Sequence, residues 1–158
     1  MKVYLHESEI VLPRPREEVF AFFADAMNLE AITPPMLRFR VRTPPPIVMA
    51  EGTLIDYSLR VRGVPMRWRT RISRWEPGRA FVDEQLRGPY RRWVHTHTFE
   101  DTDGGTRCTD RVEYAYWGST LVHAWLVKKD IERIFAYRSE RLRERFVARP
   151  GAPASDSE

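Results

Sequence analysis

The sequence predicts an α+β fold in which a curved antiparallel sheet wraps around one long C-terminal helix. Three observations predict it. One strand-like run comes first, a short helical stretch follows, and then about six runs alternate apolar and polar residues. A single long amphipathic segment closes the chain. The sheet offers a wide concave apolar face that one helix covers only in part, so we expect a cavity between sheet and helix.

Length and composition agree with one domain that has a substantial core. The chain has 158 residues, of which 42% are hydrophobic and 12% aromatic. We expect the domain to span residues 1–147 and the tail 148–158, with its prolines and small and acidic residues, to be disordered. No apolar run is long enough to span a membrane, and the N-terminus lacks the apolar stretch of a signal peptide. We therefore expect a cytoplasmic protein without integral membrane association.

The first predicted strand covers residues 2–12, and a helical stretch follows it. The apolar side of the strand changes parity across the polar residues 7–9, which predicts a bulge or twist there. Pro15 suits the first turn of a helix, because its missing N–H would be unpaired there anyway. A second short turn ends before Pro34, since proline cannot continue a helix.

Six further runs with alternating apolar residues follow. The predicted strands are residues 37–43, 53–62, 64–75, 80–87, 90–100 and 106–116. Proline and glycine turns separate them, and Asp103-Gly104-Gly105 is the strongest hairpin signal. Two facings remain open for residues 81–87. We favour the one that turns Phe81, Asp83 and Gln85 inward, because Glu84 then pairs with outward arginines of a neighbouring strand.

The closing helix is predicted to begin after a Ser119 or Thr120 cap and to run for about 27 residues, roughly 40 Å. Its apolar stripe is Leu121, Trp125, Ile131, Ile134, Phe135, Leu142 and Phe146. Helical spacing alone leaves open whether Trp125 and Phe135 are core or cavity wall. Arg138 lies near the stripe, where it meets either an acidic side chain or the anionic end of a ligand; we favour the internal ion pair.

The basic residues of the chain are nearly all arginine. Lys2, Lys128 and Lys129 are the only lysines among 26 basic residues. Eight arginines fall on the polar side of three predicted strands, at positions 38, 40, 42, 60, 62, 67, 69 and 71. A flat arginine face is one form of nucleic-acid site, but the aromatic residues have the opposite parity. We favour a solvated outer face with pairs to Asp56, Glu84 and Glu113, and expect no nucleic-acid partner.

Polar residues on the apolar side of two strands indicate a pocket. Trp93, His95, His97 and Phe99 share one side of their strand, and Asp110 shares a side with Tyr114. Two histidines and a carboxylate inside a packed core are costly without partners. Water or a ligand in a pocket removes that cost.

Two segments carry a family resemblance. They are Gly88-Pro89-Tyr90-Arg91-Arg92-Trp93-x-His95-x-His97-x-Phe99 and Phe135-x-Tyr137-Arg138-x3-Leu142. With the order of elements, they make residues 2–147 resemble the START-like superfamily, and more narrowly the polyketide cyclase/dehydrase-like ligand-binding proteins of the SRPBCC group. The resemblance implies a helix-grip fold, with a seven-stranded antiparallel sheet around a long C-terminal helix. It also implies binding of a lipid-like or polycyclic molecule, but no particular reaction.

Three functions are consistent with this reading. The first is a carrier or sensor of a small hydrophobic molecule. The ligand-binding candidates are Tyr57, Trp68, Asp83, Gln85, Trp93, His95, His97, Phe99, Asp110, Tyr114, Trp125 and Phe135. The second is a cyclase, dehydratase or aromatase in which His95 or His97 moves a proton, Asp110 orients it and Tyr57 or Tyr114 donates to an enolate oxygen. The third is a protein-interaction module. We lean toward a protein that is not an enzyme.

The single cysteine and the histidine pair bound the cofactor chemistry. Cys108 alone permits neither an internal disulfide nor a cysteine metal cluster. His95 and His97 have the spacing for one metal, with Asp83 or Asp110 as further ligands. We favour histidines hydrogen-bonded to carboxylates or water instead, and expect no metal and no cofactor. The sequence makes no prediction of oligomeric state.

Overall fold

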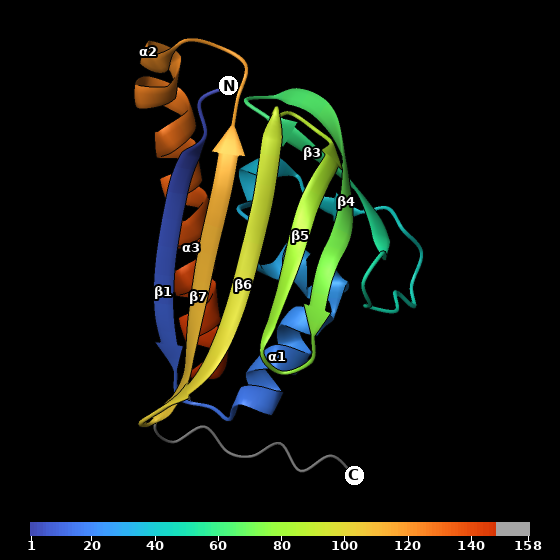
Figure 1. The fold of residues 1–158 in the computed structure, drawn as a ribbon, viewed down its shortest axis with the longest axis vertical. Helices are drawn as coiled ribbons and strands as arrows, with labels where there is room; N and C mark the ends of the chain where they lie inside the picture. Colours follow the sequence, from blue (N-terminus) through green and yellow to red (C-terminus); the bar gives the residue numbers. More distant parts are fainter. Residues whose placement is uncertain (148–158) are drawn as a thin grey trace.

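The computed structural model describes residues 1–147. In that part of the chain seven strands form one antiparallel sheet in the order β1-β7-β6-β5-β4-β3-β2 (Figure 1). The strands are β1 Tyr4–Leu12, β2 Arg40–Val41, β3 Leu54–Val61, β4 Val64–Glu76, β5 Ala80–Arg87, β6 Arg92–Thr102 and β7 Gly105–Ala115. The expected seven-stranded sheet with a closing helix is confirmed. The predicted tail, residues 148–158, lies outside the described residues.

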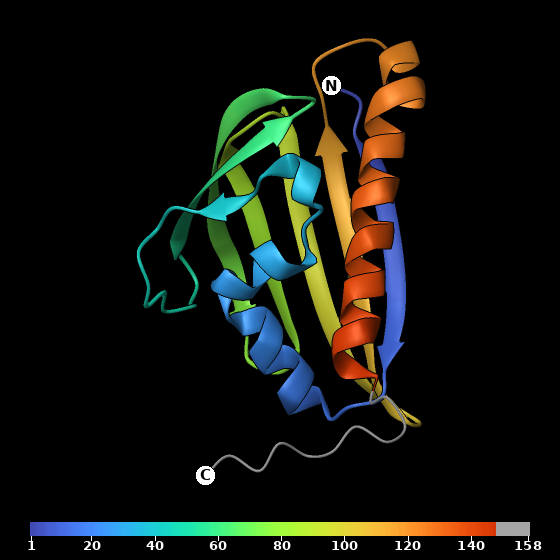
Figure 2. The same cartoon turned by 180° about the vertical axis from the view of Figure 1, so that it is seen from behind.

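The C-terminal helix lies along the concave side of the sheet, as Figure 2 shows from behind. It is continuous from Thr120 to Phe146 through three segments, namely α2 Thr120–Val122, the π-helical turn η3 His123–Val127 and α3 Lys128–Phe146. Ser119 caps it by accepting a hydrogen bond from the Val122 N–H at 3.4 Å. No helix of residues 1–147 has the length and apolar content needed to cross a bilayer.

Short helices between β1 and β2 cover the rest of the concave face (Figure 2). They are α1 Arg16–Ala24, η1 Ala26–Ile32 and η2 Pro35–Leu37. Pro15 stands directly before α1, and Glu17 and Glu18 lie in its first turn, where carboxylates favour the helix dipole. The helix buries Val19, Phe20 and Phe22.

Two predictions about the first part of the chain are wrong. β1 has no bulge, because it pairs with β7 without interruption from Tyr4 to Leu12. Its inward side carries the even-numbered residues throughout, so Leu5 points outward. The predicted strand 37–43 is reduced to Arg40–Val41. Arg38 adopts a left-handed conformation with φ of 44° before the strand. After it, the Asp56 N–H donates to the Thr43 hydroxyl at 2.8 Å, so a side chain replaces a backbone partner.

The outer face of the sheet carries the arginines, which pair with acidic residues across strands. Asp56 accepts two hydrogen bonds from Arg69, at 2.8 and 2.9 Å. Glu84 pairs with Arg71 at 3.1 Å. This places Phe81 and Asp83 on the inner face, which is the facing favoured from the sequence. Exposed pairs of this kind contribute about 1 kcal/mol or less each.

Three apolar clusters fill the space between the sheet and its cover. One joins α1, β6 and the end of α3 through Phe20, Phe99 and Leu142. A second joins β6, β7 and the start of α3, and a third joins η1, β3 and β4. The long helix and the short helices pack against different parts of the sheet (Figure 2), and a space remains between the clusters.

Candidate functional site

A cavity of about 370 Å³ lies between the sheet, the short helices and α3. That is the size of a typical small-molecule pocket. Seven of the residues proposed from the sequence line it: Tyr57, Trp68, Asp83, Trp93, His95, His97 and Phe135. They come from strands β3 to β6 and from α3. The alternation of each strand places their side chains on the same concave face.

Aromatic side chains form one wall of this cavity. The Trp68 and Trp93 rings meet edge to face, with centroids 5.4 Å apart, and Tyr90 packs against Trp93 at 4.7 Å. The Trp68 indole N–H donates to the Thr70 hydroxyl at 3.1 Å, which fixes the ring in place. This wall is therefore rigid and presents ring faces and edges to the space.

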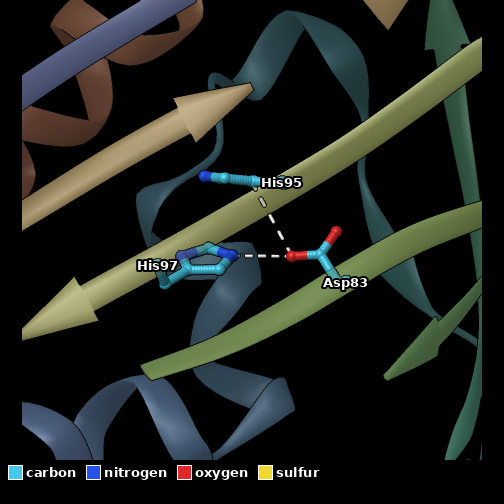
Figure 3. A group of neighbouring side chains, drawn as sticks. All are labelled: Asp83, His95 and His97. Carbon is cyan, nitrogen blue, oxygen red and sulfur yellow. Dashed lines mark hydrogen bonds and ion pairs between the residues drawn. The ribbon is translucent and has the colours of Figure 1, made fainter. Parts of the chain in front are cut away.

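The polar side of the cavity is a buried cluster of two histidines and two aspartates. The His97 Nε2 atom lies 2.6 Å from an Asp83 carboxylate oxygen, and His95 Nε2 lies 2.7 Å from Asp110. Figure 3 shows both rings on β6 beside Asp83 on β5. The two imidazoles stack with centroids 3.7 Å apart. The shortest contact of each ring is thus to a carboxylate on a neighbouring strand, and His97 also lies 3.2 Å from Asp110.

Arg138 joins this cluster from α3. Its guanidinium lies 3.3 Å from the Asp110 carboxylate and 5.2 Å from the centre of the Phe23 ring. The side chain is buried and also lines the cavity. Of the two roles left open for Arg138, the structure contains the internal ion pair.

The partners set the charge of each group in the cluster. Burial and neighbouring His97 lower the pKa of His95 to about 4. Burial by itself lowers the pKa of His97, but hydrogen bonds to Asp110 and Asp83 outweigh it and raise that pKa. Burial raises the pKa of Asp110, but Arg138 and the histidines outweigh it and hold the pKa well below its usual value. The two carboxylates are therefore ionised beside the Arg138 cation. The surroundings favour the protonated form of His97 and the neutral form of His95.

Asp83, His95 and His97 are also the residues that could hold a metal ion. Each offers one ligand atom, and the three atoms lie within 4.8 Å of one another. The stacked rings are inclined by only 29°, so their nitrogen lone pairs lie in nearly parallel planes and do not converge on one point. Arg138 adds a positive charge beside them. We assign no metal to this cluster.

The structure corrects the expectation that five other candidates line the cavity. Asp110 lies behind the histidines, and Phe99 packs into the core cluster with Phe20. The Tyr114 hydroxyl is 2.7 Å from His123 and is buried away from the cavity. Trp125 is 65% exposed, because η3 extends past the sheet.

Gln85 acts on the wall indirectly. Its side-chain amide donates to the Tyr90 carbonyl at 2.7 Å, and its carbonyl accepts the Tyr90 N–H at 3.2 Å. Gln85 therefore holds the turn before β6 and positions the Tyr90 ring in the wall. The sequence favoured its inward facing but gave no signal for this contact.

A charged rim of the cavity escaped the sequence analysis. Arg60, Arg62, Asp130 and Arg133 line the cavity where it meets the surface. Arg62, in the turn between β3 and β4, donates two hydrogen bonds to Asp130 on α3, at 2.9 and 3.2 Å. The sequence pattern predicts only a solvated outer face for Arg60 and Arg62, because neither a strand period nor a helix period shows that a turn lies opposite a helix.

The fold and the enclosed site together define a helix-grip protein with an internal ligand-sized cavity. The family model described as polyketide cyclase/dehydrase and lipid transport matches residues 12–143. The chain belongs to this family. No curated protein matches the chain.

Solved structures share this fold at low sequence identity. Protein CV1439 from Chromobacterium violaceum is 14% identical, with a TM-score of 0.72 over 92% of this chain and 98% of that one. The Zhui aromatase/cyclase from Streptomyces sp. R1128 is 16% identical, with a TM-score of 0.71 over 96% and 100%. Ginseng major latex-like protein 151 from Panax ginseng is 10% identical, with a TM-score of 0.68 over 92% and 99%. These similarities show a START-like fold.

Proposed function

We propose that this protein binds one small hydrophobic molecule in the cavity, as a carrier or sensor. The observation that carries the proposal is the cavity itself, which has an aromatic wall, a histidine–aspartate cluster inside and a charged rim at the surface. An apolar or polycyclic body packs on Trp68, Trp93 and Phe135, while a polar group of the ligand meets the histidine–aspartate cluster. The family, whose description includes lipid transport, supports this choice of ligand.

The protonation of the cluster favours binding over acid–base catalysis. Because the Asp110 carboxylate only accepts, neutral His95 donates its Nε2–H to Asp110, and its Nδ1 atom, which lies 3.7 Å from an Asp83 carboxylate oxygen, carries the lone pair. With a pKa of about 4, His95 accepts a hydrogen bond from a ligand but is a weak general base near pH 7. His97 is held between two carboxylates, at 2.6 and 3.2 Å, so its protons are already engaged.

A fluorescence titration tests the proposal. Nile red, an uncharged apolar dye, should bind the wild-type protein with one dye per chain and a large rise in emission. Leu59 is buried on β3 and lines the cavity, so Leu59→Trp should fill the space and abolish dye binding. Val11→Trp places the same indole on the outer face of β1 and should bind dye as wild type does. Equal binding by all three proteins contradicts a cavity site.

A second candidate is a cyclase or dehydratase that uses the same cavity. The observation that favours it is the position of both histidines on the cavity wall with carboxylate partners. Tyr114 has no part in it, since it does not reach the cavity, whereas burial raises the pKa of Tyr57 and keeps its hydroxyl a donor. If this candidate holds, wild type converts a bound ligand into a product, whereas the His95→Ala and His97→Ala variants bind the ligand but do not convert it. A ligand recovered unaltered from wild type excludes it.

A further inference from the structure

The end of the molecule at the start of the long helix carries a patch of exposed apolar side chains. Figure 1 shows α2 extending beyond the end of β7. Trp117 is 70% exposed, Leu121 69% and Trp125 65%. Val122 and Leu126 on the same segment are also exposed. We call this group, together with the lysines described next, the helix-end patch.

The charge around these side chains is one-sided. The three lysines of the chain, Lys2, Lys128 and Lys129, all lie at this end, although arginine supplies the other basic residues. From residue 114 to residue 129 the sequence contains no acidic residue. Lys129 lies over the Trp125 ring at 5.2 Å, and Arg91 lies over Trp117 at 4.7 Å. The nearest carboxylate along the helix that pairs with the patch is Glu132, 3.9 Å from Lys128.

Exposed tryptophans beside lysines match the interface of a lipid bilayer. Indole rings are enriched at the headgroup level, where their apolar body and polar N–H are both accommodated. Lysine stems extend along such a surface and bring the ammonium group to anionic headgroups. A patch of five exposed apolar side chains with a positive rim is complementary to an anionic membrane surface rather than to a neutral one.

The patch lies at the same end of the sheet as the charged rim of the cavity. Arg92, the first residue of β6, pairs with Ala115, the last of β7, so the turns before β6 and after β7 are neighbours. The β3–β4 turn lies at this end too, because the start of β4 runs beside the end of β5. Arg62 of that turn and Asp130 of α3 both line the cavity.

We propose that the helix-end patch docks onto the surface of a membrane that contains anionic lipid. The interaction is peripheral: the indoles of Trp117 and Trp125 enter the headgroup region, and Lys2, Lys128 and Lys129 contact lipid phosphates. Docking brings the rim of the cavity close to the bilayer surface. It goes beyond ligand binding in the cavity and does not require it.

Vesicle co-sedimentation tests this proposal with the whole chain. Wild type should sediment with vesicles of phosphatidylcholine and phosphatidylglycerol, bind vesicles of phosphatidylcholine alone much more weakly, and lose binding at high salt. Tryptophan emission should shift to shorter wavelength on binding. Lys128→Glu with Lys129→Glu should reduce partitioning on the order of tenfold or more, and Trp117→Ser with Trp125→Ser should remove the emission shift.

Matched variants outside the patch provide the controls. Arg38→Glu with Arg67→Glu makes the same change of charge at two exposed positions, after η2 and on β4, and Val48→Ser removes an exposed apolar side chain from the loop between β2 and β3. Both should bind vesicles as wild type does. The proposal is overturned if wild type does not bind vesicles, or if the controls lose as much binding as the patch variants. It is also overturned if sedimentation velocity shows a wild-type dimer that the Trp117→Ser, Trp125→Ser protein does not form, because a second copy then covers the patch. Nile red binding is measured for every variant used in the vesicle experiment. A variant that loses vesicle binding but still binds the dye has lost docking and kept its cavity site.

Discussion

The guanidinium of Arg138 lies 3.3 Å from the Asp110 carboxylate, and both side chains are buried between α3 and β7. This pair is the charged link between the long helix and the sheet. It neutralises an aspartate that also binds His95 and His97, so it fixes the positions of the two rings that the cavity presents.

Removing Arg138 should destabilise the fold strongly. Arg138→Met leaves Asp110 buried without its cation, and breaking a buried pair on one side costs about 3–5 kcal/mol. Urea unfolding should show this loss of unfolding free energy. Arg141→Met is the control, since Arg141 pairs with Glu144 at the surface and should cost about 1 kcal/mol or less.

The double variant Arg138→Met with Asp110→Leu should recover part of that loss, because the unpaired buried carboxylate is gone, but not all of it, since His95 then lacks its acceptor. If the Arg138→Met protein has the same midpoint of urea unfolding as wild type, the ion pair does not stabilise the fold as described.

Acid should weaken the fold through His95. Its pKa is about 4 in the folded protein and about 6.5 in the unfolded chain. Because the folded pKa is lowered, protons bind the unfolded chain preferentially, and stability falls as the pH decreases from about 6.5 to about 4. The linkage amounts to on the order of 3 kcal/mol. His97 has the opposite sign: its contribution is complete below its unfolded pKa and is lost as the pH rises through its raised folded pKa.

His95→Gln isolates the first effect. Glutamine retains a donor for Asp110 but does not titrate. Chemical unfolding of both proteins from pH 7 to pH 4 should show a steeper loss for wild type than for the variant. Parallel curves would mean that His95 has an ordinary pKa in the folded protein.

The Arg62–Asp130 pair should control the rate at which a ligand enters and leaves. It is the bidentate contact between the β3–β4 turn and α3 at the rim of the cavity. Arg62→Ala should accelerate both association and dissociation of Nile red in stopped-flow experiments, with little change in Kd. Stability should change by about 1 kcal/mol or less, because both side chains are partly exposed.

The exchanged pair Arg62→Asp with Asp130→Arg should restore slow kinetics. Rates that do not respond to Arg62→Ala would place the entrance to the cavity elsewhere.

Strand alternation predicted which side chains of β5 and β6 face the long helix. His95, His97 and Asp83 face the helix because a strand places every second side chain on one side, and their neighbours in that register are aromatic. The same logic assigned Glu84 to the outer face, where it meets Arg71. Alternation shows which face of the sheet a side chain lies on but not whether it reaches the cavity. Asp110 lies on the inner face as predicted, but the histidines separate it from the cavity.

Helical period and local propensity explain the failures. The stripe on the long helix includes Leu121 and Trp125, but a period does not indicate where the sheet ends, and both residues lie beyond it. The alternating run 37–43 predicts a strand, but the left-handed Arg38 and the Thr43 hydroxyl, which accepts the Asp56 N–H, limit its pairing to two residues. Contacts such as Arg62 with Asp130 join residues distant in sequence, and no local pattern predicts them.

Native mass spectrometry of the freshly purified protein tests the central claim most directly. An open cavity with an aromatic wall should retain a small apolar molecule from the cell, so wild type should show an added mass that organic extraction releases. Leu59→Trp, with the cavity filled, should lack that mass, and Val11→Trp should keep it. A wild-type spectrum without added mass, combined with no uptake when the protein is incubated with apolar compounds, would contradict the account.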